Sequence, residues 1–332
     1  RDDCAPMAQG AARCYSTCVL DPELGRTEPI HRNLELLIEY SGATFAGWQV
    51  QPNQRTAMGE IERAIARITQ ETVRVVAASR TDSGVHAYGQ VCSFRTRSTL
   101  TTAKLWAGLN GVLPDEIGVR RVREVPDSFH ARFSARGKHY RYQIFNRATR
   151  SPILAPTAWH VPEDLDLSAM QRAATFFEGE HDFSSLATKG PGGDRDDSCV
   201  RRLHAVRVGQ SKNLLTVNVV EDAFLYKMVR TIVGTLVLVG QGKQPPEWVA
   251  AAIAAKRRED AGPTAPAHGL FLVRVFYEGD EFDRESVGRY LEGIELEHND
   301  YRPRHAGPRQ REGVRRAKST EARALLRVAT KD

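Results

Sequence analysis

Several common sequence signals are missing from this chain of 332 residues. It has no run of about 18 apolar residues, so we expect no membrane-spanning helix. Its five cysteines are an odd and scattered set, which indicates a reducing compartment and argues against a disulfide scaffold. Cys14 and Cys18 have no second close Cys or His pair, so we expect no metal site.

The motifs of several large enzyme classes are missing as well. The sequence has no P-loop, no dinucleotide-binding glycine fingerprint, no His-Glu-x-x-His and no Gly-x-Ser-x-Gly. Redox, NTP-driven and serine-hydrolase chemistry therefore lack their usual signatures, and we expect no cofactor.

Positive charge is in moderate excess and unevenly spread. The net charge is +6. Residues 279–300 hold eight acids and two bases, whereas residues 301–332 hold ten bases and three acids. A basic surplus is compatible with a polyanionic partner, but a solvated tail has the same composition. Charge alone leaves both interpretations open.

Apolar residues repeat with the periods of strands and helices in turn. Residues 33–125 follow the order β-α-β-β-α-β, which is the ferredoxin-like unit. Thr56 is the predicted N-cap of the first helix, and Ile61 and Ile65 share one face of it. The predicted strands cover residues 33–40, 71–77, 88–96 and 117–125, and the second helix covers residues 101–109.

The same order recurs in the second part of the chain, with one additional helix. The predicted strands cover residues 138–145, 200–208, 214–220 and 270–277, and the helices cover residues 168–177, 224–240 and 246–256. This repeat predicts an α+β protein in which two fused ferredoxin-like halves form one mainly antiparallel sheet. We expect helices on one face of the sheet and a cleft between the halves.

The repeat divides the chain into four predicted segments. They are an N-terminal extension (1–31), a first half (32–137), a second half (138–278) and an acidic, then basic extension (279–332). The ordered part is expected to end near Tyr277. The composition beyond it predicts extended chain, partly disordered or bound to a partner, with one short helix over residues 317–328.

A polar, glycine-containing loop at residues 79–87 separates two predicted strands of the first half. Loops at strand ends often carry chemistry, and Asp82 is the candidate catalytic residue here. Arg80 would keep its carboxylate ionised and aim it. Asp is also a common turn residue, so the loop alone leaves a structural role open. His86 is interpreted as a residue that fixes the loop, because no Ser or Cys nucleophile is evidently paired with it.

Two further segments mix charged residues with apolar ones. Residues 129–142 interleave aromatics and bases, as a surface that stacks nucleobases and holds phosphates does. A half-exposed strand gives the same pattern. Lys227 and Arg230 lie in an apolar predicted helix, where an arginine seldom stays unpaired.

Seven blocks of residues occur in order across residues 33–278. The central block is Arg80-Thr81-Asp82-Ser83-Gly84-Val85-His86, followed by Gly89-Gln90-Val91. The other blocks are Tyr40, Gly42, Phe45, Gly47, Trp48 and Gln49; Asn110 with Leu113-Pro114; residues 129–135 with Lys138, Tyr140 and Tyr142; residues 179–183 with Arg201; Phe224, Met228-Val229-Arg230 and residues 232–234; and residues 263–266 with Gly269-Leu270. In content and order these blocks resemble the TruA family of pseudouridine synthases.

The resemblance implies the fold of two fused halves and an isomerase, an intramolecular transferase that converts uridine to pseudouridine in structured RNA, most often tRNA. In this reaction the N1–C1′ bond breaks, the uracil turns over, and C5 bonds to C1′. No net redox change and no energy input are needed, which agrees with the missing cofactor motifs.

The resemblance also implies roles for individual residues. Asp82 matches the family's essential Asp and would act as the nucleophile. Arg80 would help to displace the target base, and Tyr140 would stack on the flipped uracil. Arg230 matches an Arg that pairs with the catalytic carboxylate. The candidate RNA-binding residues are Arg132, Arg136, Lys138 and Lys227.

Three positions depart from the family pattern. Ser79 stands where Gly is usual, and Ser83 stands where Ala is usual; both are small, so they do not exclude activity. Asp222 stands where Asn is common. Its charge could compete with Asp82 for Arg230 and weaken the site.

An alternative hypothesis is an RNA-binding ribosome-assembly factor or RNA chaperone that retains the synthase scaffold. The two extensions and Asp222 motivate it. The expected partners are RNA, with tRNA before rRNA, and either a second copy of the chain or a larger ribonucleoprotein assembly, with no membrane. The chain starts at Arg1 and has a long basic extension, so we expect an intracellular protein, in mitochondria before the cytosol.

Overall fold

The computed structural model describes residues 31–188, 190 and 198–296, and their strands join in one sheet of ten. The strands are β1 (Arg32–Tyr40), β2 (Val76–Ala77), β3 (His86–Thr96), β4 (Ile117–Val125), β5 (Gly137–Asn146), β6 (Trp159–Val161), β7 (Gly179–Asp182), β8 (Val200–Ser211), β9 (Leu214–Glu221) and β10 (Leu270–Phe276). The helices are α1 (Ala57–Thr69), α2 (Thr102–Val112), α3 (Leu167–Thr175), α4 (Met228–Gly240), α5 (Trp248–Ala255) and α6 (Arg284–Leu296). The compact unit that contains the sheet ends at Val287.

The sheet order shows the duplication. The main path is β4-β1-β3-β10-β5-β9-β8-β7, and β2 pairs with β3 beside it. In the first half β1 thus lies between the last strand, β4, and β3, and in the second half β5 lies between the last strand, β10, and β9. The halves join where β10 runs parallel to β3, with Phe271 opposite His86 and Leu272 opposite Ala87. The predicted α+β class with two ferredoxin-like halves in a mainly antiparallel sheet is confirmed.

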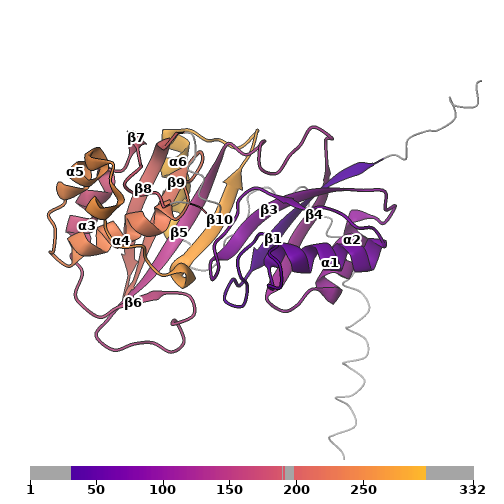
Figure 1. Ribbon diagram of the computed structural model, residues 1–332, viewed down its shortest axis with the longest axis horizontal. Helices are drawn as coiled ribbons and strands as arrows, with labels where there is room; N and C mark the ends of the chain where they lie inside the picture. Colours follow the sequence, from indigo (N-terminus) through magenta and orange to yellow (C-terminus); the bar gives the residue numbers. More distant parts are fainter. Residues whose placement is uncertain (1–30, 189, 191–197, 297–332) are drawn as a thin grey trace, which may run out of the picture. The chain divides into compact units, whose positions relative to one another are not determined.

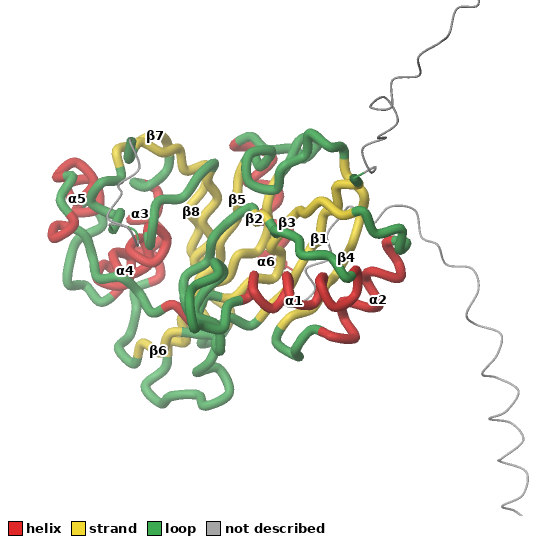
Figure 2. The backbone as a smooth tube through the Cα atoms, turned by 45° about the vertical axis from the view of Figure 1, so that its right-hand side comes forward, coloured by secondary structure: helices red, strands yellow, loops and turns green. Residues whose placement is uncertain are grey.

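Helices α1 to α5 cover one face of this sheet, whereas Phe282, just before α6, packs on the opposite face, next to Gly137 of β5. Figure 1 shows α1 and α2 in front of the first-half strands and α4 in front of the second-half strands. Figure 2 shows α3, α4 and α5 grouped beside β7 and β8. Leu34 and Leu36 of β1 lie in the same buried core as Ile61 of α1. Because alternate strand residues point to opposite faces, Asn33 and Glu35 point away from that core.

Helix α1 forms as its sequence predicts. The Thr56 side chain accepts a hydrogen bond from the Gly59 N–H, which satisfies one unpaired donor of the first turn. Ile61 and Ile65 are almost fully buried, at 0% and 1% exposure. The predicted bounds of β1 and β4 agree with the structure to within one residue.

Helix α4 begins four residues later than predicted. A turn closed by a hydrogen bond from the Met228 N–H to the Leu225 carbonyl comes before it, and in this turn Lys227 has the left-handed backbone conformation, with φ of 61°. A non-glycine residue in this conformation cannot be recognised from apolar periodicity. The turn places Arg230 in the first helical turn. Like every helix that the structure describes, α4 is too short or too polar to span a membrane.

The strand predicted over residues 71–77 is wrong for most of its length, since only Val76 and Ala77 pair as a strand. The Glu71 carboxylate accepts from the Thr96 hydroxyl and the Arg97 N–H. The Val75 N–H donates to the Glu62 carboxylate. In the residues before β2, hydrogen bonds that involve the Glu62 and Glu71 side chains therefore replace the backbone hydrogen bonds of a strand pair.

The chain beyond Tyr277 was predicted to be extended, and this is wrong for α6. The Asp283 side chain accepts from the Ser286 N–H at 2.9 Å, as an N-cap does. Phe282, 8% exposed, packs on Phe276 with ring centroids 4.8 Å apart. Neither the N-cap at Asp283 nor the buried ring of Phe282 was recognised from the sequence, because the segment is acidic and has few apolar residues. The predicted N-terminal extension up to residue 30 and the predicted helix over 317–328 lie outside the described residues.

Candidate active site

The loop between β2 and β3 is clamped on its strand by backbone and amide contacts. The Ala78 N–H donates to the Val91 carbonyl at 2.8 Å. The fully buried Gln90 side chain donates to the Ser79 carbonyl at 2.7 Å and accepts from the Ser79 N–H at 3.4 Å. A rigid strand thus holds the chain just before Asp82.

The early block of glycines and aromatics supports the same loop. The Tyr40 hydroxyl lies 2.7 Å from the Thr81 hydroxyl, and burial raises the pKa of Tyr40, so this phenol stays protonated. Two glycines permit close approach of the backbones. A Cβ on Gly42 would lie 2.0 Å from the Val85 carbonyl oxygen, and Gly47 has φ of +96° and would place a Cβ 2.9 Å from the Thr81 oxygen.

Asp82 and Arg230 meet across the two halves. The Arg230 Nη1–H donates to Asp82 Oδ2 at 2.9 Å, and the side chains are 14% and 20% exposed. The Arg230 Nε–H also donates to the Ala265 carbonyl at 2.7 Å, which fixes the plane of the guanidinium. A charge-assisted hydrogen bond in a partly dry site is strong and directional. The arrangement presents an anchored carboxylate with one oxygen not bonded to Arg230.

Tyr140 of β5 reaches the same loop. Its side chain is 5% exposed, and its hydroxyl shares a hydrogen bond of 2.8 Å with the Ser79 hydroxyl. Its ring meets the Phe224 ring edge-on, with centroids 4.9 Å apart and planes at 84°. Burial raises the pKa of Tyr140, and the Asp82 charge raises it further. Tyr140 is therefore a neutral, firmly oriented ring close to Asp82.

Sequence reasoning missed the contact of Ser79 with Tyr140, because 61 residues separate the two positions. We expect Ser79→Ala and Tyr140→Phe each to lower the rate of the reaction at this site between about twofold and about tenfold, the range of one neutral hydrogen bond. Since both variants remove the same bond, the double variant should be no slower than the slower single variant. A double-mutant cycle of single-turnover rates measures this, and multiplying effects would rule out a shared role.

His86 fixes the loop as its interpretation from sequence proposed. Its Nδ1 accepts from the Gly42 N–H at 3.2 Å, and its Nε2 lies 3.2 Å from the Pro156 carbonyl. The ring stacks on Phe271 with centroids 4.7 Å apart. Burial lowers the pKa of His86, so the ring is neutral. It joins the loop to the segments that carry Gly42, Pro156 and Phe271.

Arg80 does not lie against Asp82. Its side chain is exposed, and it makes no hydrogen bond or ion pair among the described residues. The prediction that Arg80 aims the carboxylate is therefore not what the structure shows, because Arg230 takes that place. Adjacent residues in a loop point in different directions, which composition alone cannot reveal.

The four candidate RNA-binding residues lie in different settings. Arg132 and Arg136 are exposed, and the Arg136 guanidinium lies 3.5 Å from the Asp280 carbonyl. Lys227 precedes α4, with its Nζ 5.1 Å from the Tyr226 ring centroid. Lys138 is half-buried, and burial lowers its pKa.

Glu221 lies opposite Lys138 on the neighbouring strand and is fully buried. Among the described residues, neither of its carboxylate oxygens has a hydrogen-bond partner. Burial raises its pKa well above the ordinary value and Asp222 adds to this, while the charges of Arg201 and Lys138 oppose it. Such a carboxyl is more stable protonated than charged.

This burial gives a pH-dependent prediction. A carboxyl whose folded pKa is raised favours folding below its unfolded pKa of about 4.3, and this contribution is lost as pH rises through the folded pKa. Glu221→Gln removes the loss, so its gain in free energy of unfolding over wild type should grow from pH 5 to pH 8. Urea unfolding at several pH values measures it. Parallel pH profiles for the two proteins would show that Glu221 stays charged.

Asp222 does not compete for Arg230. Its Oδ1 lies 2.6 Å from His204 Nε2, and its side chain is 49% exposed. The hypothesis that its charge weakens the pairing of Asp82 and Arg230 is wrong for this structure.

Tyr226 is a neighbour of the Asp82 and Arg230 pair that the sequence did not predict. Burial raises the pKa of Tyr226, and the charge of Asp82 raises it further.

Comparison with known proteins places these residues in a family. Residues 36–134 and 173–278 match the family described as tRNA pseudouridine synthase. A protein named tRNA pseudouridine synthase A from Ruminiclostridium cellulolyticum is 43% identical over 247 residues, 74% of this chain and 100% of that one. Proteins of the same name from Acetivibrio thermocellus and Geobacter sulfurreducens are 44% and 43% identical, over 74% of this chain and 100% and 99% of theirs. A chain in a Cbf5-Nop10-Gar1 crystal structure shares 13% identity over 73% of this chain and 59% of its own, with a TM-score of 0.29, too low to support an argument.

Proposed function

The chain belongs to the tRNA pseudouridine synthase family, and we propose that Asp82 is the nucleophile with which it isomerises uridine to pseudouridine in tRNA. It is an isomerase of RNA. The observation that carries the proposed role of Asp82 is its ion pair with Arg230, which joins the two halves at 2.9 Å.

The proposed chemistry divides between three side chains. The Asp82 carboxylate attacks the nucleotide, so that the N1–C1′ bond can break while the uracil stays in the site. Arg230 holds the carboxylate in a fixed orientation through its hydrogen bond to Oδ2. Tyr140 offers a buried, neutral ring for stacking on the uracil, and its hydroxyl is occupied by Ser79. After the uracil has turned over, C5 bonds to C1′, and the bond between Asp82 and the nucleotide breaks and frees the carboxylate. The hydrogen of C5 leaves as a proton, and N1 gains one.

Arg80 is assigned a different part of the same reaction. Its exposed side chain makes no hydrogen bond or ion pair among the described residues, so its guanidinium is available to RNA. We propose that it contacts the RNA where the target base leaves its stack, because an exposed guanidinium can both stack and bind phosphate. Arg132, Arg136 and Lys227 are proposed phosphate contacts. Lys138 is the weakest of the four candidates, because it is half-buried.

Assembly and compartment are further proposals. Two copies of the chain, or a larger ribonucleoprotein assembly, are proposed from the resemblance, and light scattering with and without tRNA would distinguish them. The relatives described above are bacterial, so the mitochondrial location rests on the sequence alone.

The alternative of an RNA chaperone is not favoured, because the ion pair of Asp82 and Arg230 is intact.

The direct experiment uses a pool of unmodified tRNA transcripts. The purified full chain is incubated with the pool, and pseudouridines are mapped by chemical adducts that stop reverse transcription. We expect conversion at a restricted set of uridines in wild type. The absence of pseudouridine in every tRNA, with binding intact, would rule out the proposed substrate.

A further inference from the structure

An exposed aromatic side chain stands apart from the catalytic loop. Phe133 is 76% exposed. Its ring stacks on His130, with centroids 4.4 Å apart and planes at 28°, and the Arg132 guanidinium lies 5.6 Å from its centroid. A single exposed apolar residue is ordinary, but an exposed aromatic ring that is oriented by an imidazole and has a guanidinium beside it is suited to stacking on a base.

The turn that carries Phe133 is fixed internally. His130 Nδ1 accepts from the N–H groups of Arg132 and Phe133, each at 3.2 Å. The Ser134 hydroxyl accepts from the His130 N–H at 3.0 Å, and the Ser134 N–H donates to the His130 carbonyl at 2.9 Å. The ring therefore loses little conformational freedom when another ring stacks on it.

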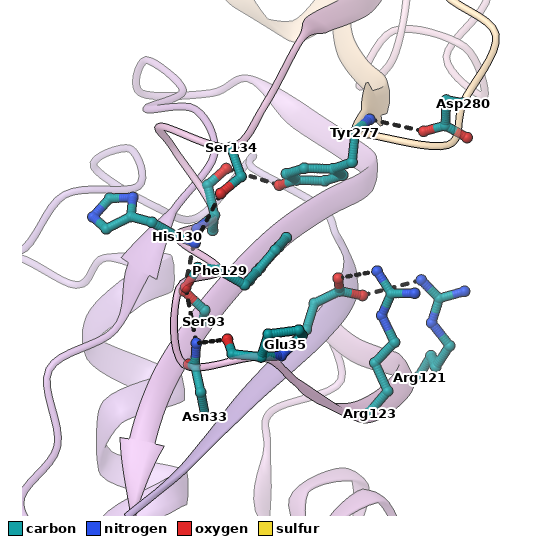
Figure 3. Close-up of polar contacts among 12 residues, drawn as sticks. Asn33, Glu35, Ser93, Arg121, Arg123, Phe129, His130, Ser134, Tyr277 and Asp280 are labelled. Carbon is teal, nitrogen blue, oxygen red and sulfur yellow. Dashed lines mark hydrogen bonds and ion pairs between the residues drawn. The ribbon is translucent and has the colours of Figure 1, made fainter.

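The same turn is fastened to the sheet from three sides (Figure 3). The Ser93 hydroxyl accepts from the Ala131 N–H at 3.3 Å. The Tyr277 hydroxyl donates to the Ala131 carbonyl at 2.8 Å, and the Asn33 amide donates to the Phe129 carbonyl at 2.8 Å. Strands β1 and β3 and the residue after β10 thus support Phe133.

Positive charge surrounds this turn. In Figure 3, Arg121 and Arg123 of β4 converge on Glu35, which is 1% exposed, while the two arginines are 30% and 46% exposed. Arg132 and Arg136 are exposed on the turn itself and just after it. An apolar protein partner would have to bury these charges, whereas RNA phosphates would neutralise them.

The platform cannot serve the target uracil, which is proposed to lie at Tyr140. Tyr140 belongs to the buried core on the helix-covered face of the sheet. Ser93, which holds the turn, lies opposite Glu35 in the strand register and so shares the other face with it. A base on Phe133 belongs to another part of the RNA.

We propose that Phe133, with His130 and Arg132, forms a second RNA subsite that stacks an unpaired base of the bound RNA away from the target uridine. This inference rests on the proposed function, because it takes RNA to be the substrate. The subsite would give the protein a preference for folded RNA that carries a second unpaired base over plain duplex RNA.

The test measures binding separately from chemistry. Fluorescence anisotropy compares two proteins, Asp82→Asn and Asp82→Asn with Phe133→Ala, on an unmodified tRNA and on a blunt RNA duplex with no unpaired base. Loss of a base stack should weaken tRNA binding by roughly 5-fold to 150-fold and leave duplex binding unchanged. Phe133→Trp should restore tRNA binding. Arg132→Ala should weaken both RNAs and lower the slope of log K against log salt by about one.

Other outcomes would overturn the subsite. Unchanged tRNA binding by the Phe133→Ala protein would do so, as would equal losses for tRNA and duplex. Loss of self-association in light scattering, with RNA affinity intact, would instead place Phe133 between copies of the chain. Because binding is measured without turnover, this failure differs from a failure of the proposed function, in which wild type makes no pseudouridine.

Discussion

The Asp82→Asn protein is expected to form pseudouridine at least about 10⁴-fold more slowly than wild type, as the loss of a covalent nucleophile requires. The amide has the shape of the carboxylate and still accepts a hydrogen bond from Arg230, so the loop should keep its place. An amide, however, is a very poor nucleophile. The measurement is the single-turnover rate with enzyme in excess over tRNA, read by nucleoside chromatography.

Binding is the control for this variant. Asp82 contacts Arg230 and is 20% exposed, so its exchange for Asn should leave the Kd for tRNA unchanged. A single-turnover rate within tenfold of wild type would exclude Asp82 as the nucleophile. A lost rate together with lost binding or an altered near-UV circular dichroism spectrum would mean that the loop had collapsed, and Asp82→Glu would then separate position from charge.

The second large effect is expected at Arg230. Arg230→Ala removes the donor that holds the Asp82 carboxylate and should lower the rate by about 10²-fold to 10³-fold, as for a lost preorganised donor. Arg230→Lys should recover only part of this loss. One ammonium cannot reproduce the two bonds of the fork, to Asp82 and to the Ala265 carbonyl. The rate and the KM for tRNA are measured on all three proteins.

Asp222→Asn is the matched control, because it changes a nearby carboxylate that binds His204 instead of Arg230. Its rate should stay close to that of wild type. An Arg230→Ala protein with a raised KM and an unchanged maximal rate would show that Arg230 binds RNA and does not position Asp82. A faster Asp222→Asn protein would show that Asp222 competes with Asp82 for Arg230 in solution.

Periodicity predicted the fold well, because most of the sheet and the five helices α1 to α5 carry their apolar residues at regular spacing. Thr56 and Ile61 identify α1 from a few residues, and the structure places both as expected. Short strands were missed: β6 has three residues and β7 has four, too few for an alternating pattern to register. Helix α6 was missed because its acidic residues suggest a solvated tail.

The site was less accessible than the fold. The loop residues pointed to Asp82, but only as one of two interpretations, and the resemblance to a family was needed to name its companions. Asp82 and Arg230 are 148 residues apart, and no local pattern encodes their contact. The loop sequence alone suggested that Arg80 pairs with Asp82, because Arg80 is only two residues away in the chain. In the structure Arg230 makes this ion pair. The turn of Lys227 that sets the direction of Arg230 depends on one unusual backbone angle.

The most direct measurement is the release of tritium from C5 of uridine in labelled, unmodified tRNA. Bonding of C5 to C1′ expels the hydrogen of C5, so each pseudouridine formed should release one tritium to water. We expect release by wild type in equal amount to the pseudouridine found, and none by Asp82→Asn, although both proteins bind the tRNA. Binding by wild type without any tritium release would contradict the assignment and leave an RNA-binding protein without this activity.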